Sequence, residues 1–94
     1  MIVRWLDAAV KDLQSLRCYI TQDNAVAAGK VVKKILDTVD MLSEYPGIGR
    51  QGRVAHTREL IVAGTPYLIP YQVKNTVIEI LRVFHCAIQW PEDF

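Results

Sequence analysis

Apolar residues recur at three- and four-residue steps along the first half of the chain, and this spacing predicts two amphipathic helices. The first series runs through Leu6, Ala9, Val10, Leu13, Leu16 and Ile20. The second runs through Ala28, Val31, Val32, Ile35, Val39 and Leu42. The polar break between them, residues 21–24, is short, so the two helices are expected to form an antiparallel hairpin.

Short polar side chains and one proline mark the expected helix ends. Asp7 is expected to cap the first helix and Asp23 or Asn24 the second, because such side chains accept hydrogen bonds from the free N–H groups of a first turn. Pro46 follows the second helix and is expected to end it, since proline disfavours helical backbone in the residue before it.

The second half of the chain has the shorter period of β-structure. Three strands are predicted, at residues 58–62, 67–73 and 77–84, after a short β-prone segment at residues 2–5. Pro70 cannot donate to a strand ladder, which predicts an edge or a bulge at that position. The expected fold is α+β in the order β-α-α-β-β-β, a single domain over residues 1–94 with the helical hairpin on one face of a small antiparallel sheet.

Charge is distributed unevenly, although the net value is only +1 from 11 basic and 10 acidic residues. The stretch from residue 46 to residue 90 has more basic than acidic side chains: Arg50, Arg53, Arg58, Lys74 and Arg82 against Glu59 and Glu79. This asymmetry favours an anionic partner for the second half of the chain.

Composition excludes several classes of protein. Arg4, Asp7 and Lys11 interrupt any apolar run at the start, so no signal peptide is expected. No stretch approaches the roughly 20 apolar residues of a membrane span. Cys18 and Cys86 lack the spacing of a metal site or a disulfide framework. We therefore expect a cytoplasmic protein with no membrane partner, no metal and no cofactor.

Strand alternation suggests how four arginines are arranged. Arg58 and Arg82 are both expected to project from the sheet face that the helices leave uncovered, with Arg50 and Arg53 above it on the preceding loop. Four neighbouring guanidinium groups would bind phosphates well. The alternative interpretation is that each arginine is a solvated surface charge or pairs with a nearby carboxylate, Glu59 or Glu79.

Other candidate groups are weaker. His85 follows a strand and is either an acid or base near neutral pH or a structural hydrogen-bond donor. The glycine-rich segment 47–53 fits no phosphate-binding motif and is interpreted as a flexible turn. In the tail, Trp90 and Phe94 are expected to pack on the core or on a partner.

These segments together resemble a known family. PGIGRQGRVAHTREL (residues 46–60), GTPYLIPYQV (64–73) and IEILRVFH (78–85), preceded by two amphipathic helices, resemble the RelE/ParE toxins of bacterial type II toxin–antitoxin systems. The resemblance implies the β-α-α-β-β-β fold and a small cytosolic toxin that a cognate antitoxin neutralises. ParE-like members inhibit DNA gyrase, whereas RelE-like members cut messenger RNA in the ribosome.

The resemblance also implies site residues. Arg58, Arg82 and His85 match basic positions of RelE-like catalysis, but Trp90 and Phe94 offer no O–H proton, which favours a ParE-like gyrase inhibitor over an RNase. The expected target-binding residues are Arg50, Arg53, Arg58, Arg82 and His85. For the antitoxin we expect an extended or helical segment that packs apolar side chains against the helical hairpin or the sheet. The candidate contacts are Ile2, Val3 and Trp5 and the exposed strand edge. A third hypothesis is an inactive member that only binds its antitoxin.

Overall fold

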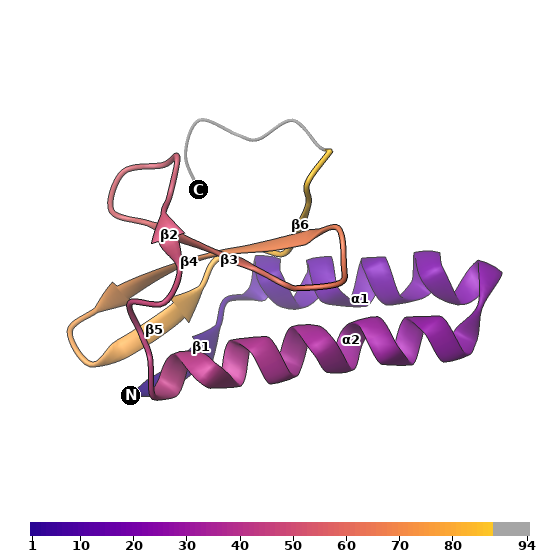
Figure 1. Ribbon diagram of the computed structural model, residues 1–94, viewed down its shortest axis with the longest axis horizontal. Helices are drawn as coiled ribbons and strands as arrows, with labels where there is room; N and C mark the ends of the chain where they lie inside the picture. The colour runs from indigo at the N-terminus through magenta and orange to yellow at the C-terminus, as the bar shows by residue number, and fades with distance from the viewer. Residues whose placement is uncertain (88–94) are drawn as a thin grey trace.

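Two helices pack on one face of a twisted sheet in the computed structural model, which describes residues 1–87 (Figure 1). Strand β1 (Ile2–Trp5) leads into α1 (Asp7–Asp23), α2 (Ala25–Asp40) and the short 3-10 helix η1 (Met41–Ser43). The remaining elements are the strands β2 (Arg50–Gln51), β3 (Arg58–Ile61), β4 (Tyr67–Lys74), β5 (Val77–Ile80) and β6 (Phe84–His85). The predicted α+β class, element order and helical hairpin are confirmed.

The sheet is mixed rather than antiparallel. Its strands lie in the order β1-β5-β4-β3-β2, with β6 paired to β4. Strand β1 runs parallel to β5 with Val3 opposite Ile78, and the other pairs are antiparallel. The expectation of an all-antiparallel sheet was wrong for this one pair. Short turns predict hairpins between consecutive strands, whereas β1 and β5 are separated by the whole helical hairpin and by the three strands β2, β3 and β4.

Of the two expected helix caps, the structure has the one before α2 and lacks the one before α1. Asn24 Oδ1 accepts a hydrogen bond of 3.0 Å from the Ala27 N–H and caps α2. The cap expected at Asp7 was wrong, because α1 begins at Asp7 itself and Leu6 occupies the cap position without a side-chain bond. The Asp7 carboxylate lies in the first turn, where the helix dipole favours negative charge.

The core lies between the helices and the near face of the sheet. Its members on the helix side include Ala9, Leu16, Ile35 and Val39, and on the sheet side Leu60, Val62, Ile69, Tyr71, Ile78 and Ile80. Within residues 1–87, no helix is long and apolar enough to cross a membrane.

The predicted strand 77–84 is interrupted opposite Pro70 of the neighbouring strand β4, because proline has no N–H to donate to it. Tyr71 pairs with Ile80, but Leu68 pairs with Phe84, so residues 81–83 face only residues 69–70. This one-residue excess is a β-bulge, and the Leu81 N–H donates to the Pro70 carbonyl across it at 3.0 Å. Of the two predicted settings for Pro70, an edge or a bulge, the structure shows the bulge, which breaks the alternation of side chains beyond Ile80.

Candidate functional site

The loop that follows η1 is held against the sheet by Tyr71 and Arg58. The fully buried Tyr71 hydroxyl donates to the Pro46 carbonyl at 2.8 Å and accepts from the Gly49 N–H at 2.9 Å. Burial raises the pKa of Tyr71 above its ordinary value, so this phenol stays protonated. Arg58 Nη1 donates to the carbonyls of Gly49 at 2.8 Å and Gly47 at 3.4 Å. The flexible turn expected here is thus tied down at several points.

Gly49 is required at this position because the Tyr71 ring lies against its Cα. A Cβ added there would lie 2.6 Å from Tyr71 Cε1 and 2.7 Å from the Tyr71 hydroxyl oxygen, closer than real Cβ atoms approach other heavy atoms.

Glu59 binds both Arg50 and Arg53. Its carboxylate is 2% exposed and accepts hydrogen bonds from Arg50 Nη2 at 3.1 Å, from Arg53 Nε at 3.2 Å and from the Arg53 backbone N–H at 2.9 Å. Burial raises the pKa of Glu59, but the hydrogen bonds from Arg53 and Arg50 outweigh it and the pKa is lowered. The alternative interpretation, pairing with Glu59, is correct for Arg50 and Arg53.

Arg58 lies on a different face from the one expected. It shares a strand face with Leu60 and Val62, as alternation predicted, but those two residues pack in the core beneath the helices. The expectation that Arg58 projects from the uncovered face was therefore wrong. Within the described chain, no carboxylate lies within ion-pair distance of the Arg58 guanidinium, whose hydrogen bonds go to neutral carbonyls.

Arg82 binds α1 and is not part of an open basic surface. Its guanidinium makes a two-point ion pair with Asp12, with Nε–Oδ2 at 2.7 Å and Nη2–Oδ1 at 3.0 Å, and the Val83 N–H donates to the same carboxylate. The hydrogen bond to Asp12 raises the pKa of Arg82. Alternation gives Arg82 the same face as Ile80, and Ile80 packs in the core. The shared face predicted for Arg58 and Arg82 is therefore the one that the helices cover, and the expectation that Arg82 projects from the open side was wrong.

His85 lies beside the aromatic ring of Tyr67. Its ring meets the Tyr67 ring edge to face, with centroids 5.6 Å apart. The two rings line an open groove of about 450 Å³ together with Asp12, Ser15, Leu16, Tyr19, Arg82, Val83 and Phe84. Arg82 and His85 therefore share this groove. The other three expected target-binding residues lie outside it, Arg50 and Arg53 at Glu59 and Arg58 at the carbonyls of the loop before β2.

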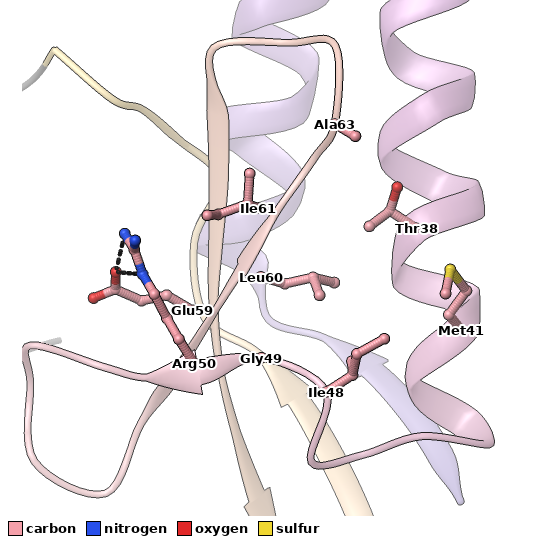
Figure 2. A pocket seen from close by; sticks show the side chains of 9 residues that line it. All are labelled: Thr38, Met41, Ile48, Gly49, Arg50, Glu59, Leu60, Ile61 and Ala63. Atoms are coloured by element: carbon pink, nitrogen blue, oxygen red, sulfur yellow. Dashed lines mark hydrogen bonds and ion pairs between the residues drawn. The ribbon is translucent and has the colours of Figure 1, made fainter.

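An apolar groove of about 420 Å³ lies between α2 and the outer edge of β3 (Figure 2). Its lining combines Thr38, Met41, Ile48, Gly49, Arg50, Glu59, Leu60, Ile61 and Ala63. Met41, Ile48 and Ile61 are each about half exposed, at 47%, 47% and 54%. Sequence reasoning did not identify this groove, because its lining comes from four separate segments.

Ile61 presents an unpaired strand edge to the groove. The Val62 N–H donates to Tyr67, so the backbone groups of Glu59 and Ile61 point away from β4. Glu59 pairs with Arg50 of β2, but β2 begins at Arg50 and no strand continues opposite Ile61 among residues 1–87. The N–H and C=O of Ile61 are therefore available to an additional strand.

Strand β1 forms the other edge of the sheet. Ile2 is 69% exposed, whereas Val3 and Trp5 are partly buried and pack against the core. Of the three expected antitoxin contacts, only Ile2 is thus freely accessible. Trp90 and Phe94 lie outside the described residues. Residues 1–87 contain no cluster of side chains that could hold a metal ion.

Comparisons with known proteins identify the family of the chain. A family model described as the ParE toxin of the type II toxin–antitoxin system parDE matches residues 3–90. The chain belongs to the ParE toxin family. This ParE-family chain is 46% identical to protein Y4kP of Sinorhizobium fredii over 90 residues, which are 96% of the chain and 93% of that protein.

Further relatives place this ParE-family chain within the broader RelE/ParE group. It is 38% identical to toxin RelE2 of Caulobacter vibrioides over 85 residues, covering 90% of this chain and 94% of that protein. A solved structure from the chromosomal ParDE toxin–antitoxin system of P. aeruginosa matches it with a TM-score of 0.81 and 30% identity, covering 90% of this chain and 95% of that one. The predicted family resemblance is confirmed.

Proposed function

We propose that this ParE-family protein is a toxin that inhibits DNA gyrase and that an antitoxin neutralises it by binding in the groove beside β3. The family match and the solved ParDE relative support a toxin with an antitoxin partner. The ion pairs of the arginines support a protein target: Arg50, Arg53 and Arg82 all have carboxylate partners. A nucleic-acid backbone is bound by several free positive charges, and these side chains do not supply them.

Purified protein is expected to block the supercoiling activity of gyrase at micromolar concentration and to trap cleaved DNA. The measurement is an agarose-gel supercoiling assay with relaxed plasmid, with toxin premixed with its antitoxin as the control that restores activity. Gyrase that stays fully active in the presence of a folded toxin would contradict the proposal.

The groove at His85 favours a second candidate function, ribosome-dependent cleavage of messenger RNA. Burial raises the pKa of Tyr67, with a further contribution from the neighbouring Tyr19. A protonated phenol therefore lies against the His85 ring, where sequence reasoning found no proton donor. Inducing the toxin alone and scoring chromosomal breaks and transcript cleavage in the same cells separates the two functions. Truncated transcripts that disappear in His85→Ala would favour the RNase.

The groove beside β3 has the chemistry of a site for an extended peptide. A partner strand placed next to Ile61 would satisfy the free backbone groups there and direct alternate side chains toward Met41 and Ile48. The Lys34 ammonium lies near Gly64, at the Ala63 end of the groove, and forms no ion pair among residues 1–87. An antitoxin segment with alternating apolar residues and an acidic residue at that end fits both features.

Ile61→Ser is expected to weaken antitoxin binding by about tenfold or more, because burying an isoleucine side chain contributes about 1.5–3 kcal/mol. Ile2→Ser is the matched control, since it is also an exposed isoleucine on an outer strand, at the opposite edge of the sheet. Isothermal titration calorimetry with the antitoxin measures both. A loss confined to Ile2→Ser would instead place the antitoxin on β1, as the sequence suggested.

A further inference from the structure

A polar pocket of about 450 Å³ lies at the β2–β3 hairpin and is lined by Gln51, His56, Thr57 and Arg58. Gln51 and Arg58 are directly opposite each other in the register and project from the same face. None of the four residues lines the groove beside α2. The pocket is therefore a separate surface from the groove proposed for the antitoxin.

The loop that closes the pocket has a fixed conformation. The Gly52 N–H donates to the Thr57 carbonyl at 2.8 Å, and both the N–H and the hydroxyl of Thr57 donate to the Val54 carbonyl. His56 takes a φ of 64°, in the left-handed region that few residues other than glycine adopt. His56 is exposed and lines the pocket. The Thr57 hydroxyl is used inside the turn, which leaves Gln51, His56 and Arg58 to bind a ligand.

Arg58 supplies a positive charge that its surroundings do not neutralise. Both of its hydrogen bonds within residues 1–87 use Nη1 and go to backbone carbonyls. Its Nε and Nη2 groups form the other side of the guanidinium fork, which matches the two oxygens of a carboxylate. Arg58 differs in this from Arg50, Arg53 and Arg82, each of which already binds a carboxylate.

We propose that this pocket binds a single carboxylate of the target protein, an aspartate or glutamate side chain held by Arg58 with Gln51 and His56. The inference rests on the proposed function, because it assigns the pocket to the target rather than to the antitoxin. Among the four candidate arginines, only Arg58 has no carboxylate partner within residues 1–87, and its single open fork suits a single carboxylate. A nucleic-acid strand would need a row of such charges along its phosphates.

Gln51→Glu tests the pocket without disturbing the loop. The new carboxylate lies opposite Arg58 and occupies the place of the ligand, while the Arg58 bonds to Gly47 and Gly49 remain. Gln22→Glu, on the exposed surface of α1, is the control with the same change in charge. We expect Gln51→Glu to weaken gyrase inhibition by about tenfold or more and to leave antitoxin affinity unchanged, with no effect of Gln22→Glu on either.

A direct titration keeps this pocket testable whatever the target is. Sodium acetate is expected to shift the NMR signal of the Arg58 Nε–H group saturably in the wild type and in Gln22→Glu, but not in Gln51→Glu. If wild-type toxin leaves gyrase active, the proposed target fails while acetate binding still decides the pocket. The inference would be overturned if acetate caused no saturable shift in the wild type. It would also be overturned if Gln51→Glu weakened antitoxin binding as much as it weakened gyrase inhibition. So would tight, salt-sensitive binding of a single-stranded oligonucleotide that Gln51→Glu abolishes.

Discussion

Tyr71→Phe is expected to lower the free energy of unfolding by about 2–3 kcal/mol, although it removes only one oxygen atom. The hydroxyl bridges the Pro46 carbonyl and the Gly49 N–H, two backbone groups more than 20 residues away in sequence. Phenylalanine fills the same space but leaves both groups without their partner in a buried place. Without these two hydrogen bonds, the loop that places Ile48 in the groove should become more mobile.

Urea unfolding monitored by circular dichroism measures this change. Tyr45→Phe is the control, because Tyr45 is 58% exposed and its hydroxyl has no hydrogen bond within residues 1–87. It should leave stability within about 0.5 kcal/mol of the wild type. Equal stability of Tyr71→Phe and Tyr45→Phe would show that the loop does not depend on the buried hydroxyl.

Local chemistry made much of the fold predictable from sequence. The apolar spacing of the two helices and the cap at Asn24 depend on residues within one or two helical turns, and the structure confirms both. Pro70 likewise predicted an edge or a bulge, because a missing N–H is a property of that residue alone, and the structure has the bulge. Asp7 failed as a cap because α1 begins one residue earlier than its side chain required.

The partners of the arginines could not be predicted in the same way. Arg82 binds Asp12, which is 70 residues away in sequence, and only the packing of α1 on the bulge brings them together. Strand parity placed Arg82 on the face of Ile80, but the sequence did not show that the helices cover this face. For Arg50 and Arg53, pairing with Glu59 was one of the interpretations that the sequence allowed. Choosing it required the register that places Arg50 opposite Glu59.

The two binding surfaces follow from the way charge is used. Because Glu59 binds Arg50 and Arg53 and Asp12 binds Arg82, three of the four candidate arginines are held by carboxylates instead of lining one open basic surface. What remains is an apolar groove with an open strand edge at Ile61 and a pocket with one free charge at Arg58. Both surfaces suit protein partners, which is why we favour gyrase over messenger RNA as the target.

Glu59→Gln is expected to destabilise the protein by about 2 kcal/mol at neutral pH, because a neutral amide cannot replace the charge-assisted bonds to Arg50 and Arg53. An amide also brings an N–H₂ group toward the donors of these arginines. The arginine side chains are themselves about half exposed, at 53% and 48%, so water can solvate them when the carboxylate is gone. This limits the cost to less than that of stranding a fully buried charge.

The loss should depend on pH in a defined direction. The pKa of Glu59 is lowered in the folded protein from its ordinary value of 4.5, so the ionised carboxylate stabilises the fold. That stabilisation is fully present above pH 4.5 and is lost as the pH falls through the lower folded pKa. Urea unfolding of both proteins between neutral and strongly acidic pH should show a constant difference above that value, which narrows below it. A difference that stays constant in acid would mean that the charge of Glu59 does not hold the loop arginines in place.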